Sequence, residues 1–80
     1  MATLRLFASA REAAGTGQAT FDGADVGEVL AAAVAAFGPQ FQIVLDNCRV
    51  WLNGDPAEPR TPVGAGDEVA VLPPVSGGFA

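Results

Sequence analysis

The sequence predicts an α+β domain in which a mixed sheet of four or five strands packs against one main helix, at about residues 26–37. Apolar residues recur at helical spacing in that segment, and apolar and polar residues alternate near both ends of the chain. Glycine, proline, asparagine and aspartate separate the periodic segments. Eighty residues, half of them apolar, suffice for one small core. We therefore expect a single domain over residues 1–75, followed by a flexible C-terminal tail at residues 76–80.

The N-terminal segment predicts a hairpin with a long loop. Residues 3–8 alternate, so Leu4 and Leu6 face the core and Phe7 faces away from it. Residues 9–15 are expected to form a loop, because glycines at positions 15 and 17 interrupt an otherwise helix-forming stretch. Residues 18–22 can then pair back as a second strand.

The main helix is predicted by its start signal, its apolar stripe and its end signal. Asp25 can cap the first turn, and Glu28 follows three residues later. The dipeptide Gly38-Pro39 is a helix stop. The apolar stripe, which must pack against a sheet, comprises Val26, Val29, Leu30, Ala33, Val34 and Phe37.

The second half of the chain predicts three further strands. Residues 41–45 are apolar and suit one helical turn beneath the sheet, and residues 48–53 form a third strand with Val50 and Leu52 on one face. Asn53-Gly54 is a turn dipeptide. Prolines restrict any strand at residues 57–63 to a short edge strand. After a turn at residues 64–67, residues 68–72 form the final strand.

Composition excludes several classes of function. The chain has a net charge of −5 with no lysine and no histidine, so it offers no basic surface for nucleic acid and no Ser-His-Asp or Cys-His pair. The single cysteine, Cys48, cannot form an internal disulfide and is expected to act as a small hydrophobic residue in a reducing cytoplasm. No apolar run approaches the roughly 18 residues of a membrane span. We expect no bound metal or cofactor, and no autonomous active site.

The C-terminal residues are unusual in composition. The last strand runs into Pro73 and Pro74, which end the sheet pairing and hold the chain extended. Val75, Ser76, Gly77 and Gly78 then form a thin tip that could enter a pocket of another protein. A frayed terminus is the simpler interpretation.

Two motifs at opposite ends of the chain resemble the MoaD/ThiS family of ubiquitin-like sulfur carriers. The first is Leu6-Phe7-Ala8 followed by Arg11-Glu12 and Gly15, and the second is Gly66-Asp67-Glu68-Val69-Ala70 followed by Leu72-Pro73-Pro74-Val75-Ser76-Gly77-Gly78. The Pro-Pro-Val sequence favours the branch of molybdopterin synthase small subunits over the thiamine branch. The resemblance implies a β-grasp fold in which the first and last strands are parallel neighbours.

The resemblance also implies a chemistry at Gly78. An ATP- and Mg-dependent activating enzyme would adenylate the Gly78 carboxylate, and a sulfur donor would displace AMP to leave a thiocarboxylate. The large subunit of molybdopterin synthase would receive the tip and transfer its sulfur to cyclic pyranopterin monophosphate, in molybdenum cofactor biosynthesis. This chain would be the sulfur-donating, non-catalytic subunit.

Phe79 and Ala80 depart from the family pattern, because they follow Gly78 and convert its carboxylate into an amide. We expect a peptidase to remove them before activation; a variant tail on an inactive copy is the alternative. Two other functions stay open: a sulfur carrier for cysteine, thiamine or another sulfur metabolite, and a ubiquitin-like modifier or interaction module without sulfur chemistry.

The strand pattern places Phe7, Trp51 and Leu72 on the side of the sheet away from the helix. Large apolar groups on an open sheet face indicate a partner-binding surface, which would continue through residues 73–77. Alternatively, a loop covers these side chains, or Trp51 turns into the core.

Overall fold

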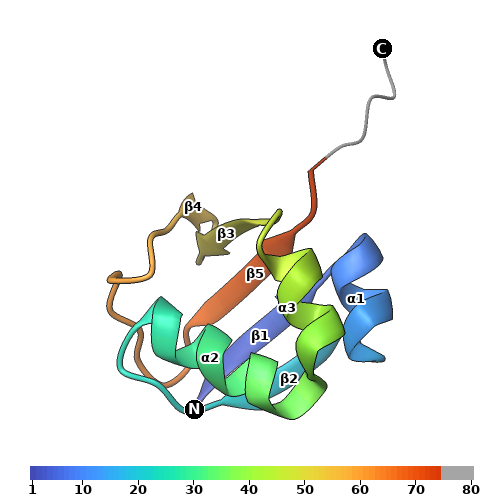
Figure 1. Cartoon of the computed structure of the whole chain (residues 1–80). Helices are drawn as coiled ribbons and strands as arrows, with labels where there is room; N and C mark the ends of the chain where they lie inside the picture. The colour runs from blue at the N-terminus through green and yellow to red at the C-terminus, as the bar shows by residue number, and fades with distance from the viewer. Residues whose placement is uncertain (75–80) are drawn as a thin grey trace.

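The computed structural model describes residues 1–74, so the expected flexible tail at residues 76–80 and the predictions for Val75, Ser76, Gly77 and Gly78 lie outside the described residues. In the described part, a five-stranded sheet has the order β2-β1-β5-β3-β4 (Figure 1). The strands are β1 (Ala2–Leu6), β2 (Gln18–Phe21), β3 (Arg49–Leu52), β4 (Asp55–Pro56) and β5 (Glu68–Leu72), and the helices are α1 (Ala8–Ala14), α2 (Val26–Phe37) and α3 (Pro39–Leu45).

The first and last strands form the centre of the sheet. β1 and β5 are parallel and place Leu4 beside Val69 and Leu6 beside Val71, whereas the β1–β2, β3–β5 and β3–β4 pairs are antiparallel. All four of these side chains are at most 2% exposed. The mixed sheet and the predicted inward face are therefore confirmed, and the parallel pairing matches the expected β-grasp arrangement.

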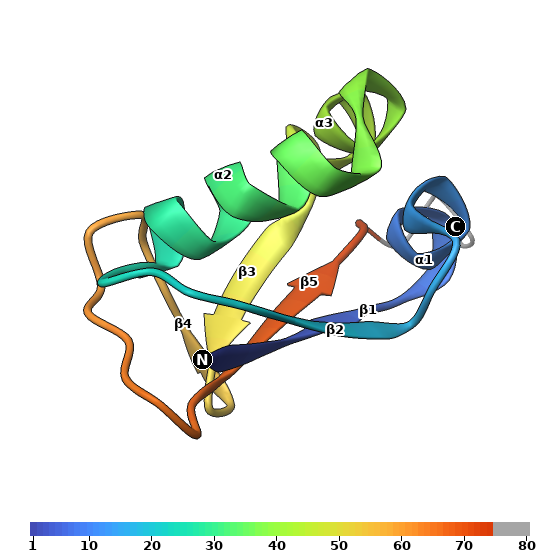
Figure 2. The ribbon, with the colours of Figure 1, turned by 90° about the horizontal axis from the view of Figure 1, so that it is seen from below.

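The main helix, α2, has the predicted bounds. Asp25 accepts a hydrogen bond from the Glu28 backbone N–H at 2.8 Å, which satisfies a free donor of the first turn, and the Glu28 carboxylate accepts one at 2.8 Å from the N–H of Ala24, the residue before the cap. Val26 and Val29 are completely enclosed by the core. In Figures 1 and 2 the three helices lie on the same side of the sheet.

The expected loop at residues 9–15 is wrong, because this segment forms helix α1. Gly15 has φ +78° and its N–H bonds back to the Arg11 carbonyl at 2.9 Å, so it caps the helix end and does not break the helix. Alanine-rich composition supplies the helical preference. Ala10 is the buried residue of this short helix.

The segment after α2 forms α3, which is longer than the single expected turn. Gly38 ends α2 as predicted, and Pro39 then starts α3, because the fixed φ of proline suits the first turn of a helix. Phe41 is fully buried and its ring meets that of Phe37 edge-on at 5.2 Å between centroids. α3 thus closes the core beside α2.

The predicted edge strand is shifted toward the N-terminus. Asn53 and Gly54 both have positive φ (+50° and +89°), so the turn closes a tight hairpin and Asp55–Pro56 pairs at once with Leu52 and Trp51. Residues 57–63 then form no regular strand; their one bridge joins Pro62 to Asp25. Within residues 1–74 no helix is long and apolar enough to cross a membrane.

Candidate partner-binding face and C-terminal exit

The open face of the sheet is formed by the side chains that alternate with the core residues, on the side opposite the helices (Figure 2). Trp51 is paired with Ala70, and Arg49 with Leu72. Phe7 directly follows β1 in extended conformation (φ −130°, ψ 152°), so the alternation continues and brings it to the side of Leu72. Phe7 is 40% exposed, and Trp51 and Leu72 are half-buried. The structure therefore brings three of the predicted partner-binding residues to one face.

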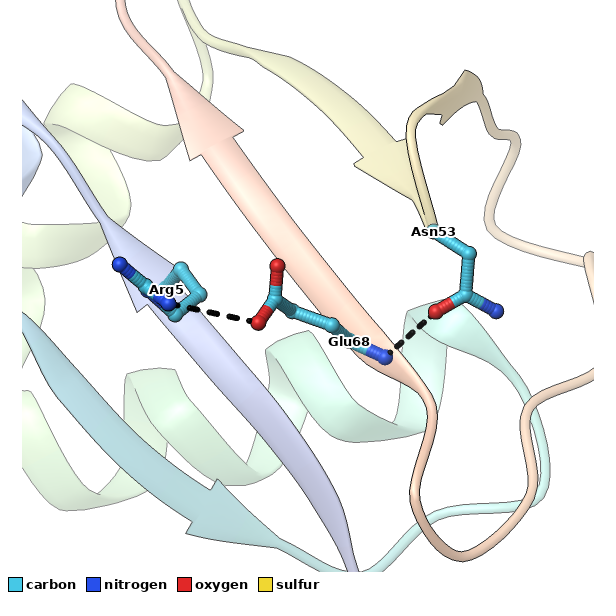
Figure 3. Close-up of polar contacts among 3 residues, drawn as sticks. All are labelled: Arg5, Asn53 and Glu68. Carbon is cyan, nitrogen blue, oxygen red and sulfur yellow. Dashed lines mark hydrogen bonds and ion pairs between the residues drawn. The ribbon is translucent and has the colours of Figure 1, made fainter.

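A polar group occupies the other end of this face. The Arg5 guanidinium lies 3.4 Å from the Glu68 carboxylate, and the Asn53 amide oxygen accepts a hydrogen bond from the Glu68 backbone N–H at 2.9 Å (Figure 3). The Asn53 side chain also donates to the Asp67 carboxylate at 3.1 Å. These contacts tie the ends of β3 and β5 together, and they leave the apolar part of the face at the end where β5 stops.

The turn before β5 is held by Asp67. Its carboxylate accepts a hydrogen bond from the Gly64 backbone N–H at 2.8 Å, and this bond, together with the weaker contribution of Asn53, lowers the pKa of Asp67. The sequence predicted a turn at residues 64–67, and Asp67 also belongs to the C-terminal motif. Its position explains the motif physically, because an ionised Asp67 fixes the turn that starts the last strand.

The chain leaves the sheet beside the apolar part of the open face. Leu72 and Pro73 are half-buried, and Pro74 is exposed. Gly78, the residue predicted to be loaded, lies outside the described residues, as do the three residues before it. The exit is thus a short ordered stem that begins between Phe7 and Arg49.

A groove of about 410 Å³ runs along the edge of the sheet at the start of β3. It was not predicted, because it forms only when the tight hairpin folds residues 56–59 back beside residues 48–51. Its lining comprises Cys48, Arg49, Val50, Trp51, Pro56, Ala57 and Pro59. Trp51 therefore borders both the open face and the groove. It is half-buried, so its side chain is neither enclosed in the core nor completely covered by a loop.

The polar groups of the groove are few. The Cys48 thiol donates to the Val44 carbonyl at 3.1 Å, and partial burial raises its pKa, so the thiol stays protonated at neutral pH. Arg49 is exposed, and within residues 1–74 the ion pairs involve only Arg5 and the N-terminal amine as cations. The same residues contain no cluster of His, Cys, Asp or Glu able to hold a metal ion.

The chain is similar to known proteins over most of its length. The chain matches the ThiS family over residues 4–78. It is 40% identical over 77 residues to the molybdopterin synthase sulfur carrier subunit of Chlamydomonas reinhardtii, a match that covers 90% of this chain and 92% of that protein.

Two solved structures are similar over nearly the whole chain. The crystal structure of SAMP1, a small archaeal modifier protein from Haloferax volcanii, superposes with a TM-score of 0.80 at 37% identity and covers 95% of this chain and 97% of that one. A complex of subunits 1 and 2 of molybdopterin-converting factor from Helicobacter pylori contains a chain with a TM-score of 0.71 at 25% identity, covering 95% and 96%. These matches establish the ubiquitin-like fold.

Proposed function

The chain belongs to the ThiS family, and on that basis we propose that it is a sulfur carrier that serves as the small subunit of molybdopterin synthase. The observation that carries the proposal is the 40% identity to a curated subunit of this kind across 92% of its length. The Pro-Pro-Val-Ser-Gly-Gly sequence at residues 73–78 supports it independently.

The proposed chemistry takes place at Gly78. A carboxylate is a poor acceptor for nucleophiles, so the activating enzyme first joins it to AMP, with release of pyrophosphate from ATP. Sulfide then attacks the acyl carbon, a C–S bond forms and AMP leaves, which gives the thiocarboxylate. ATP and Mg belong to the activating enzyme in this scheme.

The role of the described residues is to dock and to aim the tip. The large subunit of molybdopterin synthase would bind the face formed by Phe7, Trp51 and Leu72, where apolar side chains stand beside the exit. Aromatic anchors of this kind commonly dominate interface energetics. The stem at Pro73 and Pro74 would then direct residues 75–78 into the partner.

Loading requires a free carboxylate, so Phe79 and Ala80 must be removed first. The test compares the chain as it stands with a chain that ends at Gly78, each incubated with the activating enzyme, ATP, Mg and a sulfide source. Intact mass should show one oxygen replaced by sulfur only in the chain that ends at Gly78. Loading of the longer chain with residues 79 and 80 retained would contradict the processing step, and loading of neither would contradict the carrier function.

The second candidate is a protein modifier, favoured by the 37% identity to SAMP1. In that case the activated Gly78 would be attacked by lysine amines of other proteins, since this chain has no lysine of its own. Mass spectrometry of protein digests from the source cells distinguishes the two. Lysine side chains joined by an isopeptide bond to the C-terminal peptide of this chain, which trypsin would leave as residues 61–78, would favour the modifier. A free thiocarboxylate that restores sulfur transfer to cyclic pyranopterin monophosphate by the large subunit would favour the carrier.

A further inference from the structure

The edge of β3 that borders the groove is only partly covered by the chain that follows it. β4 pairs with the second half of β3, and the Ala57 N–H continues this pairing by donating to the Val50 carbonyl at 3.0 Å. The chain then turns toward the start of α2, where the Pro59 carbonyl accepts a hydrogen bond from the Gly27 N–H at 2.8 Å. The first half of β3 therefore lines the groove without a neighbouring strand on that side.

Two backbone groups of this uncovered edge are free. The main-chain groups of successive residues in a strand point to opposite neighbours. The Asn53 N–H donates to the Glu68 carbonyl of β5 at 2.9 Å, so the even-numbered residues beside it point to the groove. Among residues 1–74, neither the Val50 N–H nor the Cys48 carbonyl has a hydrogen-bond partner. These two groups flank Arg49, and backbone groups of this kind favour a ligand that satisfies them.

One residue of a parallel strand can satisfy both groups. The pair of β1 and β5 shows the pattern, because Thr3 lies opposite Glu68 and its N–H donates to the carbonyl of the preceding residue, Asp67, at 2.9 Å. A residue placed opposite Arg49 in the same way would donate its N–H to the carbonyl before Arg49. Its own carbonyl would accept a hydrogen bond from the N–H after Arg49.

The chain after β4 limits how far such a segment can extend. Ala57 already bonds to the Val50 carbonyl, so a parallel strand cannot continue past Val50. An antiparallel strand would need the place of Ala57 for the residue that bonds to the Val50 N–H. A segment that enters beside Cys48 and ends opposite Arg49 avoids both conflicts. The geometry therefore selects a free C-terminus, whose last carbonyl group is a carboxylate.

We propose that the groove binds the C-terminal residue of a partner peptide, one with an apolar side chain and a free carboxylate. The carboxylate accepts a hydrogen bond from the Val50 N–H and pairs with Arg49, which is exposed and forms no ion pair within residues 1–74. Charged partners make such hydrogen bonds stronger than neutral ones. The last side chain lies on the same face as Arg49 and Trp51, where the indole and Pro56 offer apolar surface.

The test titrates the isotope-labelled whole chain with the peptide acetyl-Gly-Thr-Gly-Leu, which has a free carboxylate. The amide NMR signal of Val50 should shift downfield, and the dissociation constant should be about 1 mM or below, as suits so small a contact. The same peptide with a C-terminal amide should bind about tenfold more weakly, because it lacks the charge. N-methylation of its leucine should also weaken binding about tenfold, because the donor to the Cys48 carbonyl is lost.

A matched pair of arginine variants tests the role of charge in the groove. Arg49→Gln should weaken binding of the free-acid peptide about tenfold, whereas Arg11→Gln, on α1, should leave it unchanged. Both side chains are exposed, so neither substitution removes a core contact.

Equal binding of the free-acid and amide peptides would overturn the proposal, and so would an equal effect of the two arginine variants. Absence of a Val50 shift up to about 5 mM free-acid peptide would overturn it as well, since binding at 1 mM would by then be nearly saturated. The site does not involve Gly78, so a failure of sulfur loading would contradict the proposed function and leave these titrations unaffected.

Discussion

Phe7→Ala tests the proposed partner-binding face most directly. Phenylalanine buries about 200 Å² when fully enclosed, and Phe7 is 40% exposed in the free domain, so a partner can cover about 80 Å² more of it. At about 25 cal/mol per Å² this is about 2 kcal/mol, or a dissociation constant raised about 30-fold. Isothermal titration calorimetry with the large subunit of molybdopterin synthase measures this change.

Ile43→Ala is the matched control for this measurement. Ile43 is even more exposed, at 61%, but it lies on α3, on the helix side of the sheet. Loss of its apolar surface should change the dissociation constant by less than about twofold, because surface changes away from the interface have small effects. Thermal unfolding checks that Phe7→Ala is folded at the assay temperature. Equal affinity of Phe7→Ala and the unmodified chain, or an equal loss in Ile43→Ala, would refute the assignment of the face.

Three further predictions concern the fold that positions this face. Both ends of α1 have positive φ, at Ala8 (+50°) and Gly15 (+78°). Gly15→Ala should therefore lower the free energy of unfolding by about 1 kcal/mol, whereas Ala8→Gly should not lower it. Urea titration measures both changes, and equal losses would contradict the backbone argument. Gly23→Ala would place a Cβ 2.8 Å from the Val29 backbone nitrogen, and it should cost about 1–3 kcal/mol because the backbone must shift; a change under about 0.5 kcal/mol would contradict it. The pKa of Asp67 is lowered in the fold, chiefly by the hydrogen bond from the Gly64 backbone N–H. Its contribution to the free energy of unfolding is therefore complete above its unfolded pKa and is lost as the pH falls below about 4. Asp67→Asn should flatten this part of the pH–stability curve, and an unchanged slope would refute the role.

Local sequence patterns predicted the elements whose determinants are local. The cap at Asp25 and the helical spacing that follows it specified α2, and the alternation at residues 68–72 specified β5. α1 was missed because Gly15 has two possible meanings in a sequence: it can interrupt a helix or provide the left-handed residue that ends one. Which of the two roles applies depends on whether the residues before Gly15 have formed helical turns.

Strand pairing and the groove could not be predicted from periodicity, because they depend on contacts between distant segments. Alternation assigns Trp51 to a face, but it does not say that Ala70 and Pro56 stand on either side of it. The groove requires the tight turn at Asn53-Gly54, which the dipeptide did indicate, together with the return of residues 56–59 along β3. The sequence contained the turn signal, but the volume enclosed by the hairpin arises only from packing.

The parallel pairing of β1 with β5 explains why two motifs at opposite ends of the chain belong together. Parallel strands run in the same direction, so the residues that follow β1 and the residues that follow β5 emerge at the same edge of the sheet. Phe7 therefore comes to lie beside Leu72, while Asp67 and Glu68 stay at the opposite edge with the ion pair between Asp22 and the N-terminal amine. Apolar side chains, with the exposed Arg49 beside them, are thus placed around the point where the chain leaves the sheet, and the acidic residues of the turn before β5 lie at the opposite end. A partner that bound Phe7 would therefore lie beside the point at which the described chain ends, at Pro74.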